Sequence, residues 1–330
     1  MQVGVMGAGA VGTFFGAMLA RGGVPVTLVG RERHVRAIEA AGLELTSGGR
    51  VDHVRMAASI DMAALATMDA VLVAVKSVDT EVVAQDLSRV LPPETLVVSL
   101  QNGVDNAWRM SAHLPNPVVP AAVYVSAEMP GDGRLRHNGG GSIVAGRPLR
   151  GGVTDDAAGP ALDALVAHFV AAGVPCRVSD DIRVDLWTKL TANCAYNAIS
   201  ALSQLRYRHI AANDGTRDVM RMVTEENAAV AAAEGVPVSV EALALAVRKI
   251  VEAMPEALSS TAQDLSLGRP TEIDSLNGFV VRRGQALGVP TPVMTLSLRE
   301  RFASQGKVDF TNRLLARMRQ AFGGHAVQTK

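Results

Sequence analysis

The chain has 330 residues, more than one compact core usually contains, so we expect two domains. Hydrophobic residues make up 48% of the sequence and charged residues 19%, a composition that excludes a disordered chain. Its 32 Lys and Arg balance its 32 Asp and Glu, without a basic tail or stripe, so we do not expect nucleic acid as a partner.

The first half of the chain alternates short apolar runs with helical patterns, which is typical of a parallel sheet built from crossover units. The expected strands are Gln2–Met6, Pro25–Val29, Ala70–Val75, Leu96–Leu100, Val118–Val125, Gly141–Ala145 and Pro175–Val178. The expected helices are Gly12–Arg21, His34–Ala41 and Asp79–Val90, and a Gly-rich turn is expected at Gly131–Gly133.

From Asp180 onward, long apolar-periodic stretches rich in Ala, Met and Glu are punctuated by prolines, a pattern that predicts helices. The sequence therefore predicts an α/β fold. A Rossmann-type doubly wound sheet should form the first domain over residues 1–179, and an all-helical second domain should cover residues 180–330.

Cysteine content and hydropathy indicate the compartment. The two cysteines, Cys176 and Cys194, are too few for a disulfide framework or a metal cluster, so we expect reduced thiols and no metal. The apolar start from Val3 to Ala20 lacks a basic region and is interrupted by glycines, which favours structure over a signal peptide. No stretch is apolar enough over a sufficient length to span a membrane. We therefore expect a soluble, cytoplasmic protein.

A G-x-G-x-x-G motif, Gly7-Ala8-Gly9-Ala10-Val11-Gly12, joins the first expected strand to the first expected helix. In that context Gly7 permits a tight turn, Gly9 lets the backbone approach a pyrophosphate, and Gly12 lets helix and strand pack closely. The helix N-terminus adds unpaired N–H groups and a partial positive charge. Glycines that serve only a tight turn are the alternative, but the strand–motif–helix order favours a dinucleotide site.

Residues after the next strands favour NADPH over NADH. At the end of the second strand, where an NAD enzyme usually has Asp or Glu, the sequence has Arg31, whose guanidinium suits a 2′-phosphate. Glu32 is expected to point to solvent. Lys76 follows a later strand and is a second positive group, although a solvated strand-end charge is the alternative. Asn102, after Leu96–Leu100, is placed either to touch cofactor and substrate or to form a turn.

Lys189, Asn193 and Asn197 are spaced by four residues, so they share one face of an expected helix. Facing a cleft, such a stripe would bind a carboxylate and donate a proton to a ketone; a solvent-facing stripe is the alternative. Further along, Thr271 with Asp274 predicts a helix N-cap. Glu272 between them either favours the helix dipole or acts in catalysis.

The ordered set of these motifs resembles the ketopantoate reductase (2-dehydropantoate 2-reductase) family of pantothenate biosynthesis over nearly the whole length. The resemblance rests on Gly7–Gly12, Arg31, Lys76, Gln101-Asn102-Gly103, Trp187 to Asn197, Ser259-Ser260, Thr271 to Asp274 and Asn277-Gly278. It implies a Rossmann domain, a helical domain and a substrate cleft between them. It also implies NADPH bound by Gly7–Gly12, with Arg31 and Lys76 at the 2′-phosphate.

The resemblance further implies that Lys189 protonates the ketone oxygen as hydride arrives at C2 of a small 2-oxo acid. Asn193, Asn197 and Ser260 would orient the substrate, Asn102 would span cofactor and substrate, and Glu272 would contact the bound ligand or cofactor. Where well-known members have a Pro-Asn-Gly-like segment, this chain has Gln204 to Arg208. Reduction of another 2-oxo acid therefore stays open, as does a non-catalytic NADPH-binding sensor. A homodimer is the family-level expectation.

Overall fold

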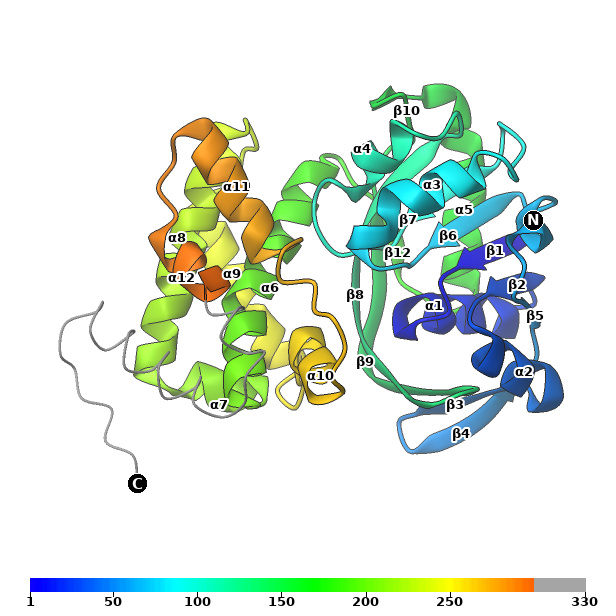
Figure 1. The fold of residues 1–330 in the computed structure, drawn as a ribbon, viewed down its shortest axis with the longest axis horizontal. Coiled ribbons are helices and arrows are strands. Elements are labelled where there is room, and N and C mark those ends of the chain that lie inside the picture. The colour runs from blue at the N-terminus through cyan, green and yellow to red at the C-terminus, as the bar shows by residue number, and fades with distance from the viewer. Residues whose placement is uncertain (300–330) are drawn as a thin grey trace. The chain divides into compact units, whose positions relative to one another are not determined.

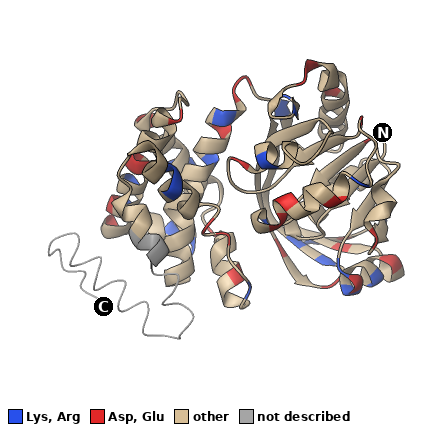
Figure 2. Cartoon of the chain, turned by 45° about the horizontal axis from the view of Figure 1, so that its top comes forward, with Lys and Arg blue, Asp and Glu red and all other residues tan. Residues whose placement is uncertain are grey.

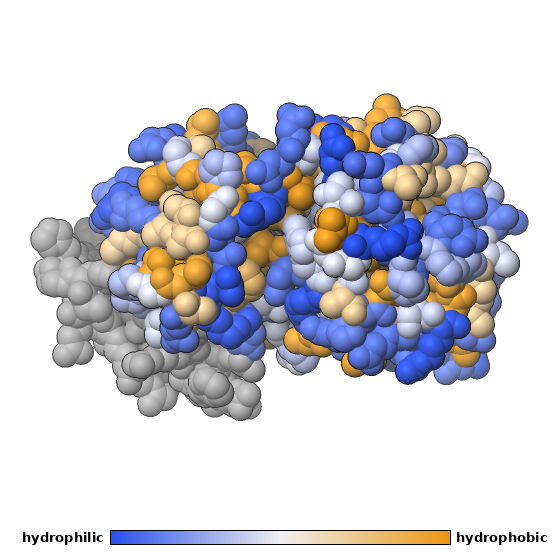
Figure 3. All heavy atoms as spheres, turned by 90° about the horizontal axis from the view of Figure 1, so that it is seen from above, coloured by the Kyte–Doolittle hydropathy of each residue, from blue (hydrophilic) through white to orange (hydrophobic). Residues whose placement is uncertain are grey.

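The computed structural model describes residues 1–299 of the chain. They form two compact units, the first covering Met1–Leu186 and the second beginning at Trp187. No helix among the described residues combines the length and apolar character needed to cross a membrane. On the face seen in Figure 3, hydrophobic residues are interspersed with hydrophilic ones.

The first unit is built on a twelve-stranded mixed sheet (Figure 1). Six neighbouring strands form its parallel core, in the order β5 (Ala57–Ser59), β2 (Val26–Val29), β1 (Val3–Met6), β6 (Ala70–Val73), β7 (Leu96–Ser99) and β8 (Val118–Gly131). The chain winds outward from β1 in one direction and from β6 in the other. The carboxyl ends of β1 and β6 therefore mark the switch point where such sheets bind ligands.

Helices cover both faces of the parallel core, because alternate strand residues point to opposite sides. Leu72 packs in one buried cluster with α1 (Ala10–Arg21) and α5 (Gly159–Ala171). Val71 and Val73 pack in another with α3 (Thr80–Leu87) and α4 (Asn106–Ser111). A further helix, α2 (Glu32–Ala41), follows β2. The predicted doubly wound α/β fold is confirmed.

The sheet extends beyond what the sequence predicted. The two expected strands around Gly131–Gly133 are one long antiparallel hairpin of β8 and β9 (Arg134–Ala145). Beside it lie β3 (Leu43–Ser47) and β4 (Arg50–Val54), which the apolar pattern did not reveal. Two further short strands, β10 (Leu149–Arg150) and β11 (Val153–Thr154), were not predicted, whereas the expected strand Pro175–Val178 is present as β12 (Cys176–Val178).

Helices follow from just beyond the expected boundary at residues 179 and 180. They are α6 (Ile182–Ser203), α7 (Tyr207–Ala212), α8 (Asp214–Ala233), α9 (Val240–Ala253), α10 (Ser260–Ser266), α11 (Asn277–Leu287) and α12 (Pro292–Arg299). From residue 187 to 299 the described chain contains no strand, so the prediction of a helical C-terminal region is confirmed. The predicted N-cap at Thr271 was wrong, because a turn covers residues 273–276 and α11 begins at Asn277.

Candidate active site

The glycine motif forms a tight loop between β1 and α1. Gly7 has φ +106°, and a Cβ there would lie 2.9 Å from backbone atoms of Ala74 and Val75. A Cβ on Gly12 would lie 2.3 Å from the Gly7 carbonyl oxygen. At Gly9, by contrast, no atom lies within 4 Å of the position a Cβ would take. The fold itself therefore requires Gly7 and Gly12, whereas Gly9 leaves open space at the helix start.

This open space fits a dinucleotide pyrophosphate. Gly9 is the N-cap of α1, and no side chain caps the helix there. The first N–H groups of a helix lack intrahelical partners and carry a partial positive charge, so they favour a phosphate. A motif whose middle glycine has free space above it lets the backbone approach such a group closely.

The register of the parallel strands brings the other predicted cofactor residues to the same edge. Met6 pairs with Val29 and Val73, and Val73 pairs with Ser99. These are the last residues of β1, β2, β6 and β7, so the four strands end at the same level of the sheet. Gly7 to Gly12, Arg31, Lys76 and Asn102 each follow one of these strand ends. The predicted cofactor residues of the first unit therefore share the edge at which doubly wound sheets bind ligands.

The charged residues next to Arg31 at the start of α2 are engaged in ion pairs, whereas Arg31 is not. Glu32 pairs with Arg36 on the exposed side of the helix, which agrees with its expected orientation toward solvent. Arg33 pairs with Asp132 at 3.7 Å. Arg31, the exposed N-cap residue, has no carboxylate partner within residues 1–299. Because charges of both signs are interspersed over the chain (Figure 2), an anionic ligand depends on local groups of this kind.

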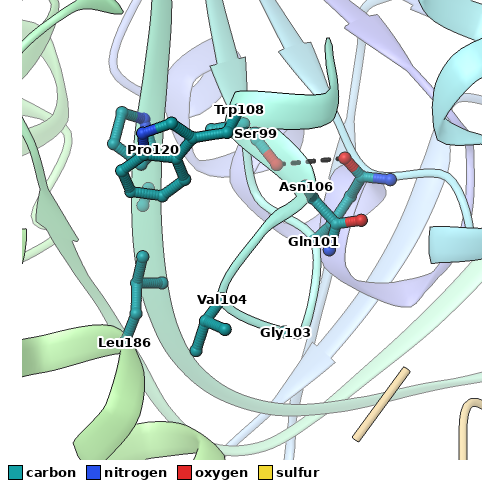
Figure 4. A pocket seen from close by; sticks show the side chains of 10 residues that line it. Ser99, Gln101, Gly103, Val104, Asn106, Trp108, Pro120 and Leu186 are labelled. Carbon is teal, nitrogen blue, oxygen red and sulfur yellow. Dashed lines mark hydrogen bonds between the residues drawn. The ribbon is translucent and has the colours of Figure 1, made fainter. Parts of the chain in front are cut away.

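A shallow, solvent-open hollow lies beside the loop that contains Asn102. Figure 4 shows Val104, Trp108, Pro120 and Leu186 around its apolar part. On its polar part the Ser99 hydroxyl donates to Gln101 Oε1 over 3.0 Å. The sequence placed Asn102 at this edge but gave no indication that Trp108 lies there, because a lone tryptophan two residues into a helix is ordinary core material.

In the second unit, the helical run of α6 places Lys189, Asn193 and Asn197 on one face, as their spacing predicted. Asn197 is buried, and Lys189 and Asn193 are half-buried. Burial lowers the pKa of Lys189 to about 8, and the nearby Glu272 carboxylate opposes part of that shift. The structure thus brings together two predicted residues that lie far apart in sequence, a lysine and a carboxylate.

Comparisons with known proteins agree with this geometry. The family described as ketopantoate reductase PanE/ApbA matches residues 3–149, and its C-terminal part matches residues 181–299. The chain belongs to the ketopantoate reductase family. The 2-dehydropantoate 2-reductases of Mesorhizobium japonicum and Halobacterium salinarum are 31% and 33% identical, each over 89% of this chain and 94% and 95% of their own.

Solved structures give the same result. A PanE/ApbA family ketopantoate reductase from Ralstonia eutropha is 44% identical, with a TM-score of 0.82 over 96% of this chain and 100% of its own. D-mandelate dehydrogenase, solved with NADH and anilino(oxo)acetate, shares the fold at 24% identity, with a TM-score of 0.80 over 97% of this chain and 99% of its own. Family membership confirms the resemblance seen in the sequence and makes the chain a member of a family of oxidoreductases that act on a small keto acid.

Two neighbouring serines of this ketopantoate reductase family member have different surroundings. Ser259 is buried, caps α10 through the Ala262 N–H at 3.0 Å, and is hydrogen-bonded to α6 through Ser200. Ser260, the predicted substrate ligand, is exposed at the first position of α10. Ser259 therefore anchors the segment that presents Ser260, a role that the sequence indicated only as a serine pair before a helix.

Tyr207 lies in the core of the second unit rather than on its surface. Its side chain is buried and its ring lies 4.4 Å from that of Tyr196, centroid to centroid. Its backbone N–H donates to the Ala257 carbonyl over 3.0 Å. These contacts tie the segment after α6 to the segment before α10.

Proposed function

We propose that the chain is an NADPH-dependent 2-dehydropantoate 2-reductase, which reduces ketopantoate to pantoate. The observation that carries the proposal is the half-buried Lys189 near Glu272: loss of solvation lowers the pKa of Lys189 to about 8, and the Glu272 carboxylate opposes part of that shift. A lysine with a pKa near the working pH is protonated at neutral pH and still gives up its proton readily, as a general acid must. The names of the curated relatives support the choice of substrate. A cytoplasmic location and a homodimer are part of the proposal.

When bound, NADPH would supply the hydride for C2 of the oxo acid. Lys189 donates a proton from Nζ to the ketone oxygen as negative charge develops there. Burial strengthens this interaction, because few water molecules screen the ammonium group. Glu272 favours the charged form of Lys189, so the amine stays protonated and able to act as the acid.

Binding and orientation fall to the polar groups of both units. The amides of Asn193 and Asn197 and the Ser260 hydroxyl would hydrogen-bond the carboxylate and hydroxyl of the substrate. Asn102 would contact both cofactor and substrate. In the first unit, Gly7–Gly12 would bind the pyrophosphate. Arg31 and Lys76 would bind the 2′-phosphate that distinguishes NADPH from NADH.

The proposal is tested by steady-state oxidation of NADPH with ketopantoate. Lys189→Ala should lower kcat by about 10²–10⁴-fold, the usual loss of a positioned general acid. Lys249, an exposed lysine on α9, provides a matched control, and Lys249→Ala should leave kcat unchanged. An unaltered kcat in Lys189→Ala would contradict the proposed role.

A panel of 2-oxo acids of increasing side-chain size decides the substrate. The highest kcat/KM for ketopantoate supports the proposal, whereas a clear preference for another member assigns the chain to a related reductase. Tight NADPH binding without turnover of any 2-oxo acid would instead indicate a sensor.

A further inference from the structure

Asn106, the first residue of α4, joins the loops that follow β6 and β7. Its side chain is only 3% exposed. Its Nδ2 donates to the Asn102 carbonyl over 2.6 Å and to Ser77 Oγ over 3.2 Å. Its Oδ1 accepts from Thr80 Oγ1 at 3.0 Å and from Arg109 Nη1 at 3.1 Å. A side-chain amide has two N–H donors and two lone pairs, and each has a partner within hydrogen-bonding distance. The single Thr80 hydroxyl proton is shared between Asn106 Oδ1 and the Ser77 carbonyl, which is 2.9 Å away.

The orientation of this amide follows from the chemistry of its partners. A guanidinium group only donates, so Arg109 must face the Asn106 oxygen. A backbone carbonyl only accepts, so that of Asn102 must face the nitrogen. Exchanging the two ends of the amide would break both contacts, so the site requires asparagine in this one orientation.

The surrounding contacts keep Asn106 in place. Arg109 also donates to the Ser77 carbonyl over 3.0 Å and binds both Glu81 carboxylate oxygens at 2.7 Å. The Arg109 hydrogen bond holds the pKa of Glu81 below its ordinary value, so the pair stays charged. On the other side, Gln101 Nε2 donates to Thr80 Oγ1 over 2.8 Å. Gln101 and Asn106, both labelled in Figure 4, thus bond to the same Thr80 hydroxyl.

We propose that Asn106 is a positioning residue of the reductase, which holds the Lys76–Ser77 loop and the Asn102 loop in one fixed arrangement. The inference rests on the proposed function, since Lys76 and Asn102 are the residues assigned to opposite ends of NADPH. Ser77 strengthens the connection, because its hydroxyl donates to the Asn102 carbonyl over 2.9 Å. The polar atoms of the Asn106 side chain bond to protein groups, so in this proposal Asn106 acts through the two loops.

Asn106→Asp removes the donors without changing the size of the side chain. A carboxylate oxygen would then face the Asn102 carbonyl, and two acceptors repel each other. Asn116 offers a matched control. It is 0% exposed and donates to the carbonyls of Pro92 at 2.7 Å and Thr95 at 3.0 Å. These loops precede β7 and β8, so they lie at the opposite ends of the strands from Asn102.

The experiment compares Asn106→Asp and Asn116→Asp for melting temperature, kcat and the Kd of NADPH. Asn106→Asp should lower kcat by about 10–100-fold, since a misplacement near 1 Å has an effect of that order. Asn116→Asp should lower the melting temperature at least as much while kcat stays within about twofold of the parent. Equal kcat in the two variants would overturn the proposal.

Two further results keep the inference separable from folding and from the proposed function. Should Asn106→Asp not fold, Ser77→Ala, which removes one of the two bonds to the Asn102 carbonyl, must lower kcat where Asn116→Asp does not. Should the parent reduce no 2-oxo acid, the proposed function fails. The Kd of NADPH then decides, because Asn106→Asp must weaken binding at least about tenfold more than Asn116→Asp.

Discussion

Alanine at Gly9 and alanine at Gly12 add the same methyl group to one loop, yet the structure predicts opposite consequences. At Gly12 the new Cβ would lie 2.3 Å from the Gly7 oxygen and 3.0 Å from side-chain atoms of Ala74 and Val5. The loop and α1 must therefore separate. Overpacking of this kind costs about 1–3 kcal/mol. In a unit of this size, each kcal/mol lowers the melting temperature by about 2–4 °C.

At Gly9 the methyl group meets nothing within 4 Å. The backbone there has φ −81° and ψ −178°, which alanine adopts without strain. Gly9→Ala should therefore leave the free energy of unfolding unchanged or raise it by about 0.4–1 kcal/mol, because alanine lowers the conformational entropy of the unfolded chain. The methyl group instead occupies the space above the α1 N-terminus. Losing one hydrogen bond to a charged phosphate, worth about 1.5–3 kcal/mol, would weaken NADPH binding roughly 10–100-fold.

Calorimetric melting and fluorescence titration with NADPH, applied to both variants and the parent, separate these effects. We expect Gly12→Ala to lower the melting temperature, and Gly9→Ala to lose affinity at an unchanged or higher melting temperature. If Gly9→Ala binds NADPH as tightly as the parent, the pyrophosphate does not lie at this loop. If Gly12→Ala has the same melting temperature as the parent, the steric argument is wrong.

Two predictions concern charge. Arg31→Ala should raise KM for NADPH about tenfold or more and leave KM for NADH nearly unchanged, since only NADPH carries the 2′-phosphate; equal effects in steady-state assays would remove this pairing. Glu272→Gln removes the carboxylate that raises the pKa of Lys189, so that pKa should fall below about 8. Reduction needs the protonated amine, which is lost as pH rises, so the alkaline fall of kcat should occur at a pH about one unit lower than in the parent. An unchanged pH profile would contradict the coupling between Glu272 and Lys189.

The parallel core was predictable because its strands are buried on both faces and therefore form continuous apolar runs such as Val71-Leu72-Val73. Strand β4 escaped prediction for the opposite reason, since four of its five residues are exposed and Arg50, Asp52 and His53 are polar. The long hairpin was shortened in prediction because register shifts, as between Tyr124 and Val125, break the alternation expected of a strand.

Within the site, spacing was enough to predict the glycine loop and the shared face of Lys189 and Asn193. It could not predict that Lys189 is half-buried near Glu272, because that depends on how α6 packs against a segment far away in sequence. The contacts of Asn106 were equally hidden. Its partner Ser77 lies 29 residues earlier, and an asparagine at the start of a helix is usually interpreted as a cap.

Burial of Lys189 bears on the choice between an enzyme and a nucleotide sensor. An ammonium group loses favourable hydration when it is buried, which is why the pKa of Lys189 falls to about 8. Glu272 offsets only part of that loss, so the lysine weakens the fold compared with an apolar side chain of similar size. Nucleotide binding does not need this arrangement, because the glycine loop and Arg31 belong to the other unit. Proton transfer to a developing alkoxide does need it, so the energetic cost of the buried lysine favours catalysis.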